Sequence, residues 1–142
     1  MKRVFFDTSA LMKRYLRHEK GTEQVEIILE TTEEIIVAPT YYIEAVHVVG
    51  RLSREKKIST TQIGEITKEI GLDYEDFHIS IYDNSLIAIA AEYAATLGVK
   101  TLDAIQLASA KVSKTKCFVT ADKPLYNHAK KIKNWSAIFI GV

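Results

Sequence analysis

Four carboxylates in the 142-residue sequence could together form a reactive site: Asp7, Glu44, Asp103 and Asp122. Two carboxylates about 4 Å apart repel by roughly 4 kcal/mol at an effective dielectric near 20, so four gathered together would need a cation among them. Oxygen-only ligation favours a hard divalent ion, Mg²⁺ or Mn²⁺. Zinc is not indicated, because the sequence has one cysteine and its four histidines lack the spacing of paired ligands.

Asp7 and Asp122 each follow a short apolar run that predicts a buried strand. Asp7 comes directly after residues 4–6, and Asp122 comes shortly after residues 117–119. The carboxyl ends of parallel strands lie at one edge of a sheet, and ligand sites form there where the strand order reverses. We therefore expect both side chains at this edge, although Asp is also a preferred helix N-cap.

Glu44 and Asp103 belong to predicted helices. Glu44 lies in the otherwise apolar stretch 42–46, early in the helix that follows the second strand, and a carboxylate rarely enters such surroundings without a partner. Asp103 lies in the first turn of a helix that begins near Thr101, where the helix dipole alone could favour it. It reaches the other acids only if that helix starts at the same edge of the sheet.

The elements that must position these acids alternate along the chain. Continuous apolar runs predict strands at 4–6, 35–38, 117–119 and 137–140, and an alternating run at 77–81 predicts a half-exposed edge strand. Helical patterns begin near Thr22, Thr40, Ser59, Asp83 and Thr101. Strands that alternate with helices predict right-handed crossovers and a three-layer α/β/α sandwich.

Two of the predicted helices carry more specific signals. Ser59 and Gln62 have the spacing of a capping box, in which each side chain accepts a hydrogen bond from the other residue's backbone N–H. The helix after Asp83 is apolar around most of its circumference, which predicts a buried helix.

Composition favours a single soluble domain over residues 1–142, expected in the cytoplasm. The sequence is 47% hydrophobic and 26% charged, and no apolar run approaches the ~20 residues needed to span a bilayer. After Glu92 the only acidic residues are Asp103 and Asp122, whereas lysines are frequent: Lys100, Lys111, Lys114, Lys116, Lys123, Lys130, Lys131 and Lys133. This bias indicates either a solvated lysine surface or an anionic partner, of which nucleic acid is the commonest.

Four motifs, taken in order, resemble those of the PIN-domain nucleases: Asp-Thr-Ser-Ala-Leu at 7–11, the isolated Glu44, Leu-Asp-Ala-Ile-Gln-Leu-Ala-Ser-Ala at 102–110, and Val-Thr-Ala-Asp at 119–122. Within that family, the chain looks most like the VapC toxins of toxin–antitoxin pairs. The resemblance covers the whole chain. It implies a five-stranded parallel sheet in the order 3-2-1-4-5.

The resemblance also implies a function, that of an Mg²⁺- or Mn²⁺-dependent endoribonuclease. Its catalytic residues would be Asp7, Glu44, Asp103 and Asp122, with Asp7, Asp103 and Asp122 as metal ligands. The hydroxyls of Thr8, Ser9 and Thr120 would support them by binding water or orienting a carboxylate. Whether one or two ions act is left open.

Partners follow from the same resemblance. RNA phosphates would meet basic residues near the acids: Lys13, Arg14, Arg17 and Lys123. A small antitoxin would block the acidic pocket. A homodimer is also expected, with its contact on the helices around residues 40–56 and 59–72.

Other interpretations of the acids remain. A haloacid dehalogenase-type phosphotransfer enzyme would need a second Asp where Ser9 stands, and a receiver domain would need a pair of acids there. A PIN nuclease of RNA processing or DNA repair outside a toxin–antitoxin pair stays possible, as does a catalytically inactive PIN-fold binding module. Loss of acids would favour the inactive module, and no acid is missing.

Overall fold

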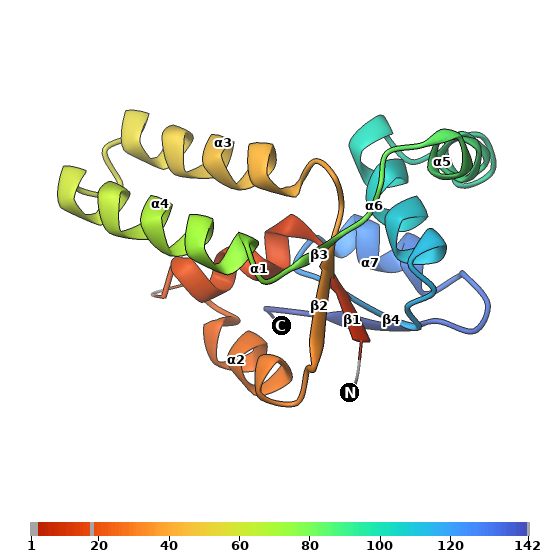
Figure 1. Ribbon diagram of the computed structural model, residues 1–142, viewed down its shortest axis with the longest axis horizontal. Helices are drawn as coiled ribbons and strands as arrows, with labels where there is room; N and C mark the ends of the chain where they lie inside the picture. The colour runs from red at the N-terminus through yellow and green to blue at the C-terminus, as the bar shows by residue number, and fades with distance from the viewer. Residues whose placement is uncertain (1–2, 18, 142) are drawn as a thin grey trace.

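The computed structural model describes residues 3–17 and 19–141, and a parallel sheet forms its centre (Figure 1). The strands of this described part are β1 (Arg3–Phe6), β2 (Glu34–Val37), β3 (His78–Ile79), β4 (Cys117–Thr120) and β5 (Ser136–Phe139). They are all parallel, in the order β3-β2-β1-β4-β5. The predicted order is confirmed, and so is the edge position of the short strand β3.

Helices cover both faces of the sheet. One face carries α1 (Thr8–Tyr15), α2 (Thr22–Glu30), α3 (Tyr41–Arg54) and α4 (Thr60–Tyr74). The other face carries α5 (Asn84–Leu97), α6 (Thr101–Val112) and α7 (Lys123–Ala129). Figure 1 shows α3 and α4 projecting together to one side of the sheet, with α5 and α6 on the opposite side. The predicted α/β/α layering is confirmed.

The central strand β1 is buried on both faces, which explains its uninterrupted apolar run. Val4 and Phe6 belong to the core beneath α1–α4. Phe5 points the other way and stacks on Phe118 of β4, with ring centroids 5.2 Å apart. Because successive side chains of a strand alternate in direction, a strand covered on both faces must be apolar at every position.

Helix starts were predicted well where a side-chain cap is present. Ser59 and Gln62 form the complete capping box at the start of α4. Asp83 Oδ1 accepts a hydrogen bond from the Leu86 N–H at the start of α5, at 3.0 Å. These bonds satisfy donors that the first helical turn leaves free.

The prediction that the helix after Asp83 is buried was wrong. Within α5 only Leu86 and Ala90 are buried, and Ile87 is 42% exposed. The helix packs mainly against α6, and only its Leu86 and Ala90 join the buried core on this face of the sheet (Figure 1). Its alanines allow that close contact, but they carry no information about the side that faces solvent. In the described residues no helix is both long and apolar enough to cross a membrane.

Candidate active site

Asp7 occupies the point where β1 ends and α1 begins. Its side chain is 5% exposed, and its backbone N–H donates to the Val119 carbonyl of β4 at 2.8 Å. The carboxylate does not cap α1. Instead, its Oδ2 accepts from Ser9 Oγ at 2.5 Å and from Thr120 Oγ1 at 2.8 Å. Helix capping therefore does not explain why Asp7 is here.

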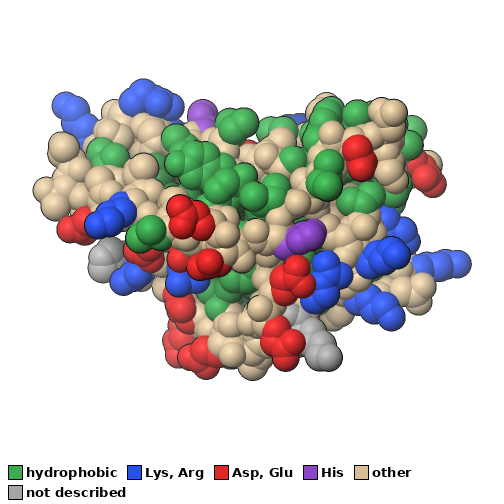
Figure 2. Space-filling view, in the orientation of Figure 1, with side chains coloured by type: hydrophobic (Ala, Val, Ile, Leu, Met, Phe, Trp, Pro, Cys, Tyr) green, Lys and Arg blue, Asp and Glu red, His purple; other side chains and the backbone are tan. Residues whose placement is uncertain are grey.

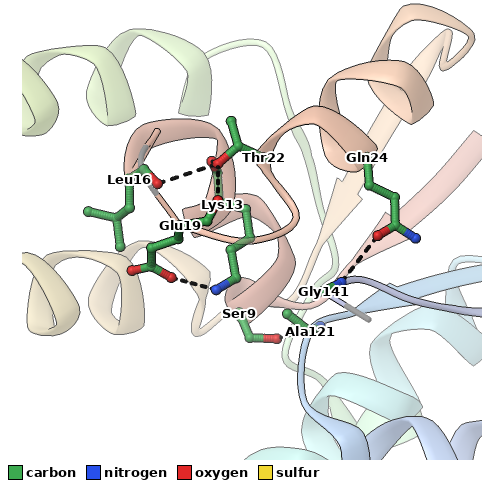
Figure 3. Close-up of polar contacts among 8 residues, drawn as sticks. All are labelled: Ser9, Lys13, Leu16, Glu19, Thr22, Gln24, Ala121 and Gly141. Atoms are coloured by element: carbon green, nitrogen blue, oxygen red, sulfur yellow. Dashed lines mark hydrogen bonds and ion pairs between the residues drawn. The ribbon is translucent and has the colours of Figure 1, made fainter.

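The two hydroxyls are themselves oriented by the backbone that follows β4. The Ala121 N–H donates to Ser9 Oγ at 3.0 Å, and the Asp122 N–H donates to Thr120 Oγ1 at 3.1 Å. Figure 3 shows Ser9 of α1 lying beside Ala121. A hydroxyl has a single proton, so a hydroxyl that accepts from a backbone N–H still has its proton to donate to Asp7. Two of the predicted supporting hydroxyls thus hold one oxygen of Asp7.

Glu44 is held in the same one-sided manner. Its Oε1 accepts three hydrogen bonds, from Thr40 Oγ1 at 2.7 Å, Gln106 Nε2 at 2.8 Å and Thr8 Oγ1 at 3.3 Å. Glu44 lies in the first turn of α3, directly after the loop that leaves β2. The sequence predicted that Glu44 needs a partner because its neighbours are apolar. That partner is a set of three neutral hydrogen-bond donors.

Gln106 is a site residue that the sequence analysis missed. It lies on α6 and is 1% exposed. Besides its bond to Glu44, its Nε2 lies 3.4 Å from Thr8 Oγ1, while its buried Oε1 has no hydrogen-bond partner in the described part of the chain. The available signal was a long polar side chain between Ile105 and Leu107, within the buried run of α6.

Asp103 and Asp122 complete the group of acids. Asp122 is the N-cap of α7, and its Oδ1 accepts from the Leu125 N–H at 3.1 Å, so the capping interpretation holds for this oxygen. Asp103 lies in the first turn of α6, as predicted, and is half-buried. Burial raises the pKa of Asp103, and the charge of Asp122 raises it further, so Asp103 lies close enough to the end of β4 to interact with Asp122.

The electrostatics of the site disfavour negative charge. Burial, together with the charges of Glu44 and Asp103, raises the pKa of Asp7 to about 6 against the lowering effect of the Ser9 and Thr120 hydrogen bonds. Burial also raises the pKa values of Glu44 and Asp103, and the charge of Asp103 adds to the effect at Glu44. No ion pair among the described residues includes any of the four acids. The four acids therefore interact as one cluster, in which Lys100 and His128 lower the pKa of Asp103 without cancelling its rise.

This cluster suits a hard divalent cation. Within the described residues, Asp7 Oδ1 and Glu44 Oε2 take part in no hydrogen bond, so each acid keeps one oxygen for a ligand. No three acidic, histidine or cysteine side chains of residues 3–17 and 19–141 are arranged to hold an ion as they stand. Mg²⁺ keeps several waters and is usually bound through one or two carboxylates, so this donor set fits it.

The four basic residues expected near RNA have different partners. Lys13 Nζ pairs with Glu19 at 2.5 Å (Figure 3). Arg14 Nε lies 3.5 Å from Asp73, and Arg17 Nη2 lies 2.9 Å from Glu69. Lys123 Nζ instead lies over the rings of Tyr126 and Phe139, at 4.9 and 4.7 Å from their centroids.

The fold and the acids together define a class: an α/β domain whose buried and half-buried carboxylates gather at the carboxyl edge of a parallel sheet, where β1 and β4 lie on either side of the strand-order reversal. The PIN domain family model matches residues 4–131. The chain belongs to the PIN domain family. This is a family of nucleases, and membership supports nuclease activity in general. No curated protein sequence matches the chain.

Several solved structures share the fold over nearly their whole length. FitAcB from Neisseria gonorrhoeae is 18% identical with a TM-score of 0.68, over 97% of this chain and 96% of that one. The toxin–antitoxin complex from Klebsiella pneumoniae is 15% identical with a TM-score of 0.67, over 95% of each chain. VapBC2 from Rickettsia felis, bound to a promoter DNA fragment, is 12% identical with a TM-score of 0.67, over 98% of each chain. At these identities the likeness concerns the fold.

Proposed function

We propose that this protein is an Mg²⁺- or Mn²⁺-dependent endoribonuclease that acts as the toxin of a toxin–antitoxin pair. One observation carries the catalytic part of the proposal. Asp7 and Glu44 each have one oxygen held by hydrogen bonds to neutral groups and a second oxygen left for a ligand. A purely structural carboxylate in a buried setting would be expected to have its charge compensated by a cationic side chain.

The roles of the residues follow from their positions. Asp7, Asp103 and Asp122 would bind the metal, while Glu44 would complete the shell or accept a proton from the attacking water. Ser9 and Thr120 hold Asp7, and Thr8 helps to hold Glu44, so these hydroxyls fix the direction of the free oxygens. A bound Mg²⁺ would lower the pKa of a nearby water and offset charge on the phosphoryl oxygens.

RNA is the proposed substrate because of the family resemblance and the basic bias of the second half of the chain. Lys123 directly follows Asp122 and pairs with no acid among the described residues, so it is the best placed of the basic residues to meet a phosphate. Lys13, Arg14 and Arg17 would have to exchange their present acidic partners for phosphate.

The proposed protein partners are a small antitoxin and a second copy of the chain. The likeness to toxin–antitoxin structures supports the antitoxin, which would block the acidic pocket, for example with an arginine. For the homodimer, we propose a contact on the helices around residues 40–56 and 59–72. The exposed apolar side chains of α3 support it: Tyr42, Ile43 and Val46. An antitoxin reading frame beside the gene would favour this function over a PIN nuclease outside such a pair.

Cleavage of structured and single-stranded RNA in Mg²⁺, Mn²⁺ or EDTA tests the catalytic proposal. Wild type should cleave only with metal, and Asp7→Asn and Asp122→Asn should be folded and inactive. Asp76→Asn is the matched control, because this exposed acid lies outside the site and should leave cleavage unchanged. Cleavage by Asp7→Asn would refute the assignment. Failure of wild type to bind Mn²⁺ at millimolar concentration would instead favour a non-catalytic binding module.

A further inference from the structure

Six lysines form a basic surface that begins beside the acidic site and ends at the opposite edge of the sheet. We name it the lysine track; its members are Lys123, Lys130, Lys131, Lys133, Lys114 and Lys116. Figure 2 shows Lys and Arg side chains gathered at the right of the molecule, over the turns that precede β4 and β5 in Figure 1. Acidic side chains in this view gather mainly elsewhere, towards α2.

The topology of the sheet brings the two halves of the track together. Helix α7 begins at Lys123, after its N-cap Asp122 at the carboxyl edge of the sheet, and leads back to the edge where β5 starts. Strands β4 and β5 are parallel neighbours, with Cys117 opposite Ser136. The Ser136 N–H donates to the Lys116 carbonyl at 2.7 Å. The turn before β4 and the turn before β5 therefore adjoin, although they are distant in sequence.

Tyr126 contacts two lysines of the track, one at each end of α7. Lys123 Nζ lies 4.9 Å from the centre of the Tyr126 ring, and Lys130 Nζ lies 5.2 Å from it. These residues are three and four positions apart on α7, so they share one face of the helix. Cation–π contacts of this kind hold the amines in place while leaving their charge without a counter-ion.

The charges of the track are not neutralised by ion pairs within residues 3–17 and 19–141. None of the ion pairs among the described residues includes any of the six lysines, whereas Lys13, Arg14 and Arg17 are all paired with acids. Helix dipoles favour cations in the last turn of a helix. That explanation does not extend to Lys116 and Lys133, which lie beyond the ends of α6 and α7.

We propose that the lysine track binds successive phosphates of a single RNA strand whose scissile phosphate lies at the acids. This inference rests on the proposed nuclease function and adds a path for the substrate beyond the site. A four-residue strand spans about 13 Å, so a ligand that reaches both ends of the track must be extended. A linear polyanion matches a row of unpaired cations that starts at a phosphodiester-cleaving site.

Binding of fluorescent single-stranded RNA to inactive Asp7→Asn protein in EDTA tests the track without cleavage. One variant replaces the four far lysines with glutamine: Lys114, Lys116, Lys131 and Lys133. A charge-matched control replaces four exposed lysines elsewhere: Lys20, Lys56, Lys57 and Lys68. Log affinity falls as log salt concentration rises. If each far lysine meets one phosphate, this dependence should be weaker in the variant, with a slope smaller in magnitude by about 3. Affinity for a long RNA should fall about tenfold or more at low salt.

The control should bind like the parent protein, and replacement of the same four far lysines by arginine should preserve binding. Equal losses in the variant and the control would overturn the track, because net charge alone would then explain binding. An unchanged salt slope in the variant, or no binding of long RNA by the parent, would also overturn it. If RNA binds along the track but wild type with metal never cleaves it, the nuclease proposal is refuted and the lysine track is still supported.

Discussion

Replacing Asp7 with asparagine should stabilise the metal-free protein while abolishing its activity. Burial raises the pKa of Asp7 from 3.8 to about 6, which corresponds to about 3 kcal/mol of destabilisation by the charged form. The amide oxygen of asparagine can still accept from Ser9 Oγ and Thr120 Oγ1. Its nitrogen, however, takes the place of Oδ1, and burying an unpaired amide donor costs about 1–3 kcal/mol. The expected net gain is therefore up to about 2 kcal/mol.

The difference in stability between wild type and Asp7→Asn should decrease as the pH falls. At pH 7, above both pKa values, Asp7 is mostly ionised in the folded and unfolded states, so the full penalty applies. As the pH falls through about 6 towards 3.8, the folded state takes up the proton first, and wild type becomes more stable. About 1 kcal/mol of the difference between the two proteins should disappear between pH 7 and pH 5.

Metal should reverse the order of stability. An ion that binds only the folded protein stabilises it by about 2.7 kcal/mol when its concentration is 100 times its dissociation constant. Wild type should gain this stability in Mn²⁺ or Mg²⁺, and Asp7→Asn should lose most of it with its ligand oxygen.

Urea unfolding, followed by circular dichroism at pH 5 and pH 7 in EDTA and in Mn²⁺, measures these differences. Asp76→Asn serves as control, because an exposed carboxyl should change neither the pH profile nor the response to metal. If Asp7→Asn is less stable than wild type in EDTA at pH 7, burial of the Asp7 charge does not destabilise the folded protein as we infer. Equal stabilisation of both proteins by Mn²⁺ would contradict the role of Asp7 as a ligand.

Three further predictions concern single residues. Gln106→Leu removes one of three donors to Glu44 Oε1 and should lower metal-dependent cleavage about 10–100-fold with little loss of stability, measured by turnover and urea unfolding. Burial raises the pKa of the Cys117 thiol, so iodoacetamide should label the native protein at pH 7.5 far more slowly than the unfolded protein, as mass spectrometry can follow. Ser59→Ala breaks the capping box with Gln62 and should lower the free energy of unfolding by about 1 kcal/mol without affecting cleavage.

The sheet could be predicted because its strands are short and continuously apolar. Residues 4–6 and 117–119 are typical of strands covered on both faces, and their ends place Asp7 and Asp122 at the same edge of the sheet. The strand order came from the family resemblance, since periodicity does not determine which strands are neighbours. Structure and resemblance agree on the order β3-β2-β1-β4-β5.

The polar contacts of the site could not be predicted because they join distant parts of the chain. Gln106 reaches Glu44 across 62 positions, and Thr120 reaches Asp7 across 113. Such pairs depend on how α3, α6 and β4 pack, which no local pattern encodes. The error at α5 has a related cause: an alanine-rich helix packs closely against one neighbour, and its composition does not show which side is covered.

The hydrogen bonds at the site also constrain how it can act. The hydroxyls of Ser9 and Thr120 accept hydrogen bonds from the backbone N–H groups of residues 121 and 122. The end of β4 therefore directs the hydroxyl protons of Ser9 and Thr120 towards Asp7 before any ligand binds. Asp7 and Glu44 are thus oriented in advance, although burial raises the pKa of each and so disfavours its charge. A cation that neutralises the acids would meet oxygens already aimed at it, so its binding energy need not be used for ordering. In such a site, loss of either hydroxyl should weaken metal binding more than it weakens the fold.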